Sequence, residues 1–207
     1  DVVGTAADTL TVTTNDGGNT GSGGAQQDVD TVQIDITPVN DTPVVNGPGS
    51  ALSATEQVGL AIHGTGFTVS DVDAASGTMT ATINVGVGAI TVAAGDSGVS
   101  ISGGNGTGTV TITGTLSQID NLLTGASTGT ITYLNSSDTP SASTTITVTV
   151  NDGGNTGADP GLTADGTSEE DSASQTINIT ATNDAPTNTV PGTRTVAEET
   201  TTAISGV

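Results

Sequence analysis

The sequence predicts an all-β fold, built as tandem antiparallel β-sandwich repeats with one short helical insert. Apolar residues alternate with threonine over long runs, as at 146–150 (Ile-Thr-Val-Thr-Val), and a period of two indicates strands with one buried face. Gly, Asn and Asp clusters, which are typical of turns, separate these runs at nearly regular intervals. In addition, the heptapeptide Asn-Asp-Gly-Gly-Asn-Thr-Gly occurs twice, at 15–21 and at 151–157. The duplication indicates that the chain contains repeated domains.

The heptapeptide belongs to a larger repeated unit. In each copy a strand runs into the heptapeptide, a polar loop follows, and a second alternating strand ends in Asn-Asp-x-Pro, at 40–43 and at 183–186. The heptapeptides are 151 − 15 = 136 residues apart and the Asn-Asp-x-Pro motifs 183 − 40 = 143, so the second loop is the longer one. A period of about 140 residues is too long for a solenoid and indicates separate domains, each with its own core.

This period divides the chain into three parts. We predict that residues 1–43 are the C-terminal hairpin of one repeat with its linker, that 44–184 form a complete repeat, and that 185–207 hold the N-terminal strand of a following repeat. Glu198 supports the last assignment because it lies 198 − 56 = 142 residues after Glu56 in a similar context. A two-stranded hairpin is not stable alone. We therefore expect the other strands of the first repeat on the N-terminal side of this sequence.

Local signals define the individual elements. Pro38 and Pro43 mark the linker at 39–43, because proline cannot donate to a sheet ladder. One segment, 115–123, changes to helical spacing of its apolar residues, with Thr115 or Ser117 as the N-cap and Gly125 as the end. The predicted strands, in order, are 8–14, 30–37, a split first strand of the complete repeat at 44–51 and 57–62, then 67–70, 79–85, 88–93, 99–102, 107–113, 128–134, 144–150 and 173–181.

The charge of the chain restricts its partners. It has 22 acidic residues and a single basic one, Arg194, which gives a net charge of −21. Such a chain lacks the cations that bind nucleic-acid phosphates or an anionic membrane surface, and no apolar run approaches the roughly 20 residues of a membrane span. The regular alternation argues against an acidic disordered segment. Divalent cations are the expected partner.

Calcium fits the available ligands best. It prefers six to eight oxygen ligands, and this sequence offers Asp, Asn and Glu oxygens at strand ends, with one His and no Cys. Two carboxylates about 5 Å apart repel by roughly 3 kcal/mol at an effective dielectric near 20, so a cluster of them favours a bound cation. Simpler readings stay open. A lone Asn-Asp-Gly-Gly is a common turn, Asp71-x-Asp73 is compatible with a solvated loop, and Glu169-Glu170-Asp171 is expected as a solvated loop tip.

Four motifs, in this order, resemble those of cadherin repeats. Glu56 resembles the glutamate early in the first strand of that family, and Asp71-Val72-Asp73 resembles its Asp-x-Asp motif. The corner at 150–154 resembles the Asp-x-Gly corner after the penultimate strand, and 181–186 resembles the Asn-Asp-x-x-Pro linker. The resemblance covers the complete repeat and both flanking fragments, and it implies a cadherin- or immunoglobulin-like sandwich.

The closest resemblance is to the cadherin-like tandem repeats of giant bacterial surface proteins. The shared features are Val-Ser-Asp-Val-Asp-Ala at 69–74, Gly-Thr-Leu-x-x-Ile at 114–119 and the Asn-Asp-Gly-Gly corners. Many of these proteins are type I-secreted adhesins of the RTX and VCBS types with calcium-binding repeats. The resemblance therefore implies calcium ions at the junctions between repeats.

Carried over residue by residue, the resemblance implies one set of ligands at the junction before the complete repeat, which we call the upper junction. Asn40 and Asp41 would come from the linker, and Asp71, Asp73 and Asp152 from the top of the complete repeat.

At the opposite end, the lower junction, Glu56 and Asp138 would face Asn183 and Asp184, with further ligands from the next repeat. Asp16 would serve a junction farther upstream.

The sequence departs from vertebrate cadherins at one place. Pro38 and Ala181 stand where those proteins have a further Asp, so we expect one ion per junction rather than three.

The implied function is that of a non-catalytic, calcium-rigidified extender in a large bacterial cell-surface adhesin, acting outside the cell in adhesion and biofilm formation. Neighbouring repeats of the same polypeptide would be its partners. Two alternatives stay open: a module that binds surface glycans or like repeats on other cells, for which Tyr133 is the best aromatic candidate, and a subunit of a structural surface filament. We predict no enzyme, because His63 stands alone and no catalytic constellation is present.

Overall fold

The computed structural model describes residues 4–19, 21–74, 76–155, 169–190, 192–193 and 195–203, and within them it is built almost entirely of strands. The prediction of an all-β fold with one helix is confirmed. The elements are β1 (Gly4–Asn15), β2 (Gln27–Ile36), β3 (Val44–Asn46), β4 (Leu52–Thr55), β5 (Leu60–Ala61), β6 (Thr68–Ser70), β7 (Met79–Val85), β8 (Ala89–Ala93), β9 (Ser100–Gly103), β10 (Thr109–Gly114), α1 (Leu116–Thr124), β11 (Thr130–Leu134), β12 (Ser143–Asn151) and β13 (Glu170–Thr180).

Three sheets enclose one core between residues 44 and 180. The largest sheet has the order β4-β13-β12-β7-β10-β9, a second has the order β5-β11-β8, and β3 pairs with β6. The alternating sequence explains the layers, because every second residue of β7, β10 and β12 is buried while its neighbours are exposed or half-buried. Inward-facing residues of both larger sheets belong to a single hydrophobic cluster. The core is filled mainly by aliphatic side chains, with Phe67, Met79 and Tyr133 also fully buried in it.

Helix α1 closes one edge of this core. Its N-cap is Thr115, one of the two predicted candidates, and it forms a capping box with Gln118. Thr115 Oγ1 accepts from the backbone N–H of Gln118, and Gln118 Oε1 accepts from the N–H of Thr115. The helix ends at Gly125, which takes a left-handed φ of 72°. In the described part of the chain no helix is long and apolar enough to cross a membrane.

The first strand of the complete repeat is split into three pieces rather than the predicted two. Gly47-Pro48-Gly49 separates β3 from β4, and a turn at Glu56-Gln57, where Gln57 has a φ of 59°, separates β4 from β5. Each piece pairs with a different strand, and β4 lies parallel to β13, with Leu52 opposite Ile177. The prediction of a purely antiparallel arrangement is wrong here. After the break at Pro48 the chain moves to the edge of the large sheet without reversing its direction. Because β13 runs in the same direction, β4 pairs with it in parallel.

The acidic stretch 169–171 is also not the solvated loop tip that was predicted. Glu170 and Asp171 begin β13, where Asp171 pairs with Val150. The carboxylate of Asp171 accepts a hydrogen bond from the backbone N–H of Val45 at 2.8 Å. This contact gives the residue a structural role.

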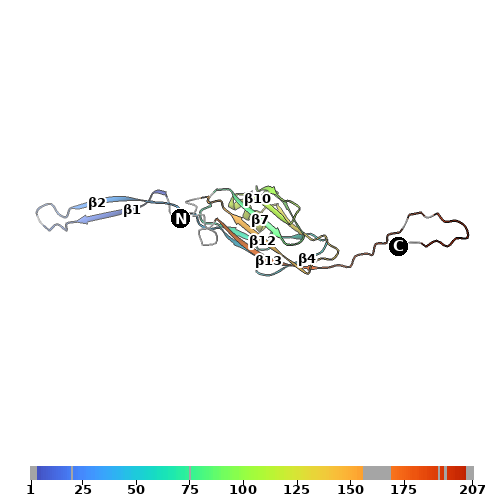
Figure 1. Ribbon diagram of the computed structural model, residues 1–207. Coiled ribbons are helices and arrows are strands. Elements are labelled where there is room, and N and C mark those ends of the chain that lie inside the picture. Colours follow the sequence, from blue (N-terminus) through green and yellow to red (C-terminus); the bar gives the residue numbers. More distant parts are fainter. Residues whose placement is uncertain are drawn as a thin grey trace.

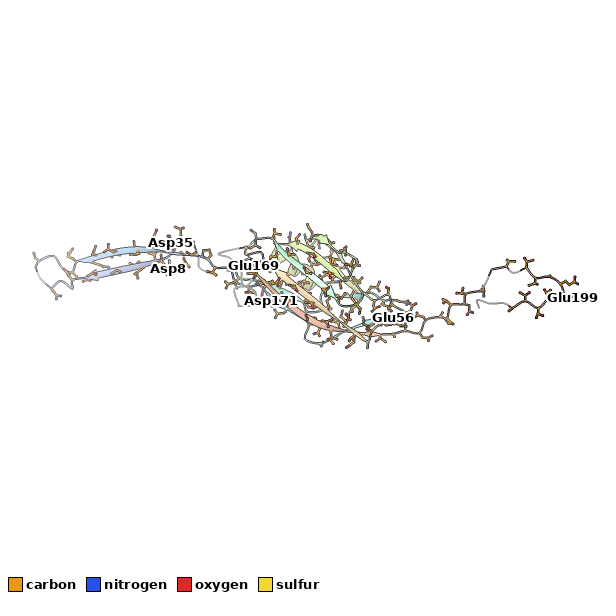
Figure 2. The ribbon with its side chains drawn as sticks, viewed as in Figure 1. Asp8, Asp35, Glu56, Glu169, Asp171 and Glu199 are labelled. Atoms are coloured by element: carbon orange, nitrogen blue, oxygen red, sulfur yellow. The ribbon has the colours of Figure 1, made fainter. Side chains whose placement is uncertain are left out.

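The chain enters and leaves the sheets at opposite ends, as Figure 1 shows. The hairpin β1–β2 extends from one end, and the C-terminal segment leaves from the other. In Figure 2, Glu169 and Asp171 lie at the end that faces the hairpin, whereas Glu56 lies at the end from which the C-terminal segment departs. The upper and lower junctions of the sequence prediction are therefore the two ends of one elongated domain.

Hairpin β1–β2 makes almost no contact that would bury it. Its apolar side chains are exposed, including Leu10 at 54% and Val32 at 57%. These two residues pair directly, and their face of the hairpin carries both apolar and acidic side chains, since Val12 lies opposite Asp30 and Asp8 opposite Ile34. Of the predicted third part, 185–190, 192–193 and 195–203 form no strand in the structure, and the predicted residues 204–207 lie outside the described range.

Candidate metal centre

The first component of the site is the corner at the end of β12. Asn151 Oδ1 accepts from the N–H of Gly153 at 2.8 Å, and Asp152 Oδ1 accepts from the N–H of Gly154 at 3.0 Å. Both glycines take positive φ values, 69° and 67°, which residues with a side chain rarely adopt. The two successive turns direct the second carboxylate oxygen of Asp152 inward, and the residue is fully buried.

The second component follows β6. Asp71 Oδ1 accepts hydrogen bonds from the N–H groups of Asp73 at 3.0 Å and Ala74 at 3.1 Å. Such a turn is a local property of an Asp followed by a short loop. It fixes the orientation of Asp71 and uses only one of its two oxygens. The spacing Asp-x-Asp then places a second carboxylate beside the first.

The linker supplies the third component. The backbone N–H of Asp41 donates to Asp73 Oδ2 at 3.1 Å, so the linker is tied to the loop after β6. Asn40, directly before it, is only 1% exposed. Prolines 38 and 43 flank this segment, with β2 ending at Ile36 and β3 beginning at Val44. The predicted stop in pairing is not complete, because Val39 between the prolines forms an isolated bridge. The linker therefore passes over the top of the domain close to the carboxylates.

Together these components form one cluster of carboxylates. One oxygen each of Asp71, Asp73 and Asp152 lies within 4.8 Å of the others, and this is a group that could hold a metal ion. At that largest separation two ionised carboxylates repel by about 3 kcal/mol at an effective dielectric near 20. The sequence offers one Arg and no Lys to neutralise 22 acidic residues. A bound cation would supply the positive charge that the chain itself offers so sparingly.

Several side-chain oxygens at this end accept no hydrogen bond from the described residues. They are Oδ1 of Asn40, Oδ2 of Asp71 and Oδ2 of Asp152, each buried. A buried acceptor without a partner costs roughly 1–3 kcal/mol, and more when it is charged. A cation coordinated by these oxygens would remove that cost. Their burial distinguishes this cluster from ordinary acidic surface residues.

The same environment changes the acidity of Asp71. Burial, and then the neighbouring Asp73, raise the pKa of Asp71 from 3.8 to about 6, against the lowering effect of its backbone hydrogen bonds. A carboxyl that resists ionisation beside two others is what a metal-free cluster of like charges produces. All donor atoms are carboxylate or amide oxygens, which suit hard cations such as Ca²⁺ and Mg²⁺ rather than ions that prefer N or S ligands.

The lower junction is built differently. Glu56 is 1% exposed, and its Oε1 accepts from both the N–H (2.6 Å) and the hydroxyl (2.9 Å) of Thr182. Its Oε2 is buried and has no hydrogen-bond partner among the described residues. The lower junction thus holds one buried carboxylate, of which one oxygen accepts hydrogen bonds and the other does not. The upper junction, by contrast, brings three carboxylates together.

The other residues predicted for the lower junction remain at the surface. Asn183, Asp184 and Asp138 are exposed. Gln57 bridges two of them, because its Nε2 donates to Asp138 at 2.8 Å and to Asp184 at 3.4 Å. These carboxylates form no group with Glu56 that could hold an ion within the described chain. Asp16 is likewise exposed, at the far end of hairpin β1–β2.

Three residues that matter for these ends were not predicted. Thr182 and Gln57 hold the lower acidic residues, and Asn155 fastens the Asp152 corner. Only Asn155 had a signal in the sequence, since it is part of the repeated heptapeptide.

Comparison with known proteins does not identify the chain: no protein-family model matches it, and no curated protein sequence is significantly similar to it.

Proposed function

We propose that this chain is a calcium-binding, non-catalytic extender segment of a large bacterial cell-surface adhesin, built from tandem cadherin-like β-sandwich repeats. The observation that carries the proposal is the upper junction. There, carboxylates from two separate loops converge, and one oxygen each of Asp71 and Asp152 accepts no hydrogen bond from the described residues. The linker that carries the buried Asn40 is hydrogen-bonded to one of these loops. A single ion at this place would be coordinated by the linker and by the domain together. It would thereby fix the angle between consecutive repeats.

Calcium is the preferred ion for two reasons. The donor set contains only oxygens, and loops rather than sheet strands supply it, which allows the long and irregular coordination that Ca²⁺ tolerates and Mg²⁺ does not. Three carboxylates and one amide are also fewer protein ligands than a high-affinity site has. Extracellular calcium modules work at roughly 10⁻⁴–10⁻³ M, which agrees with the proposed location at the cell surface.

The tandem arrangement is supported by the register of the two hairpins. In β1–β2, Asp8 lies opposite Ile34 and Leu10 opposite Val32. The corresponding pairs in β12–β13, obtained by adding 136 and 143, are Thr144 with Ile177 and Ile146 with Gln175, and both are observed. Two hairpins of identical register and identical corner are what two copies of one domain would contain.

The third copy has similar support. Gln57 and Glu199, 142 residues apart, are two of the three non-glycine residues with a positive φ in the described chain, at 59° and 58°. The turn around each is closed by the same hydrogen bond, from Val58 N–H to Thr55 O and from Thr200 N–H to Ala197 O. The segment after the lower junction thus begins as the complete repeat does.

The test is calorimetric and hydrodynamic. Calcium titrated into the 207-residue chain should bind, raise the thermal midpoint and reduce the spread of interdomain orientations seen by small-angle scattering. Ligand at 100 times its Kd stabilises a fold by about 2.7 kcal/mol. Magnesium at the same concentration should have a smaller effect. Identical melting and scattering in calcium and in chelator would refute the proposal.

The alternative of a glycan-binding module loses its main support. Sugar-binding sites use exposed aromatic rings, and Tyr133 is fully buried in the core. The structure offers no observation that favours a glycan-binding module or a filament subunit over the extender.

A further inference from the structure

We infer that Asn155 is a positioning residue that holds the Asp152 corner against the loop after Asp71-Asp73 before any ion is bound. The inference rests on the proposed calcium function of the upper junction and adds to it the device that assembles the site. Asn155 is the fifth residue of the repeated heptapeptide, three positions after the buried Asp152.

The contact itself connects two loops that are distant in the sequence. Asn155 Nδ2 donates to the backbone carbonyl of Thr78 at 2.9 Å. The neighbouring residue, Gly77, leaves the space that the amide occupies, because a Cβ atom at Gly77 would collide with the Asn155 amide group. Gly77 shows no positive φ. We therefore attribute the glycine to this close approach and not to its backbone conformation.

The contact continues into the metal cluster. The N–H of Gly77 donates to the carbonyl of Ala74 at 2.8 Å, and the N–H of Ala74 donates to Asp71 Oδ1 at 3.1 Å. Asn155 thus lies at one end of a short series of contacts whose other end is a carboxylate of the site. We call the contact of Asn155 with Gly77 and Thr78 the clasp.

The clasp has an electrostatic purpose. Without an ion, Asp152 carries the same charge as Asp71 and Asp73, which are within 4.8 Å, and repulsion favours moving the corner outward. A neutral side chain that fastens the corner opposes this movement without adding charge. Ion binding then requires less rearrangement, and preorganised ligands bind more tightly for that reason.

The first copy of the heptapeptide provides a natural comparison. Its equivalent residue, Asn19 (19 + 136 = 155), donates instead to the carbonyl of Asp16 in its own turn, at 2.8 Å. The same side chain thus closes the turn on itself in the hairpin, where Asp16 is exposed and not part of a cluster. In the second copy the loop at Gly77 and Thr78 faces the corner, and Asn155 donates to that loop instead.

The test is calcium titration calorimetry on the 207-residue chain and its variants. Asn155→Ala should raise the calcium Kd by up to about tenfold, because the net free energy of one hydrogen bond corresponds to a factor of that size. Asn19→Ala should leave the Kd unchanged. Gly77→Ala should weaken binding to a similar degree by displacing the Asn155 side chain. The double variant should be no weaker than either single one, because both changes break the same contact.

The outcomes separate the two ideas. If the unaltered chain binds no calcium, the proposed function fails. If it binds calcium in a way that Asp152→Asn abolishes but Asn155→Ala does not alter, only the clasp is wrong. Additive losses in the double variant would also overturn it. Melting in chelator provides the structural control: equal loss of stability with and without calcium would mean that Asn155 merely supports the fold.

Discussion

The two Asn-Asp-Gly-Gly corners have the same local structure and opposite surroundings. In each, the Asn side chain accepts from the first Gly N–H and the Asp side chain from the second, at 2.7 and 2.9 Å in one copy and 2.8 and 3.0 Å in the other. Yet Asp16 is exposed and Asp152 is fully buried beside two other carboxylates. The turn is determined by the four residues Asn-Asp-Gly-Gly. The ion site is determined by loops that come from elsewhere in the chain.

The difference also affects acidity. Backbone hydrogen bonds from Gln26 and Gly18 lower the pKa of Asp16, so its carboxylate is satisfied within its own hairpin. At the other corner, burial raises the pKa of the neighbouring Asp71 to about 6. The carboxylate of the first corner is stabilised in its charged form, whereas the second corner lies beside a carboxyl whose charged form is disfavoured.

The largest expected difference between the two hairpins is in packing. Ile146 is fully buried, and its counterpart Leu10 is 54% exposed. In the 207-residue chain, Ile146→Ala should lower the free energy of unfolding by about 2–5 kcal/mol, and Leu10→Ala should change it by no more than about 0.5 kcal/mol. Urea unfolding measures both. Comparable losses in the two variants would mean that the first hairpin is packed in solution.

The next effect concerns the ion. Asp152→Ala should weaken calcium binding at the upper junction by at least the roughly 10–100-fold that changes outside the ligand shell can cause, while the domain stays folded. Asp16→Ala is the matched control and should not affect the affinity of that site. Titration calorimetry decides the matter, and equal weakening by both variants would contradict the assignment of the upper junction.

Without calcium, a substitution that removes the charge of Asp152 should stabilise the domain rather than impair it. Asp152→Asn keeps the acceptor for Gly154 and removes one of three clustered charges, so in chelator it should raise the stability by about 1 kcal/mol, part of the repulsion between neighbouring carboxylates. Asp16→Asn, at the exposed corner, should have no such effect. Thermal melting in chelator tests this pair. A lower midpoint for Asp152→Asn would show that the charge is already compensated in the metal-free protein.

The smallest expected effect is on pH dependence. The pKa of Asp71 is raised in the folded state from 3.8 to about 6, so between these values the folded state binds more protons than the unfolded one. Stability in chelator should therefore rise as pH falls from 6 to 4.

In calcium the trend should be opposite, because protons compete with the ion for the same oxygens. Asp71→Asn should remove the slope in chelator and reduce the slope in calcium, because Asp73 and Asp152 remain as ligands that protons can occupy. Midpoints measured at pH 4, 5 and 6 are sufficient, and the same slope with and without calcium would contradict the assignment.

Most strands and the helix could be predicted because the local sequence patterns agree with the burial that the fold imposes. Alternation predicted the strands of the large sheet other than β4 to within a few residues, and Thr115 was one of the two predicted N-caps of the helix. The convergence of Asp71, Asp73 and Asp152, proposed from a resemblance and from charge, is the arrangement that the structure contains. Asp71 and Asp152 directly follow strands and begin turns whose Asp and Gly residues are recognisable in the sequence.

The missed features depend on distant partners. The acidic residues at 169–171 resemble a loop, but Asp171 is paired with Val150 and accepts from the N–H of Val45, 126 residues away. The parallel pairing of β4 is likewise invisible in its own four residues, since it depends on which sheet edge is open after Pro48. Gln57 gave no signal because its amide acts between two carboxylates that only the fold brings near.

The parallel pair β4–β13 has a mechanical consequence. One strand belongs to the entering part of the chain and the other leads to the exit, and the two run side by side over four residue pairs, from Leu52 with Ile177 to Thr55 with Thr180. Tension applied between linker and exit would pull these strands in opposite directions along their axes. The hydrogen bonds between the two strands would then be loaded in shear and share the force, instead of breaking one after another. A tether made of such domains would resist stretching at the sheet edge where the sequence pattern seemed least regular.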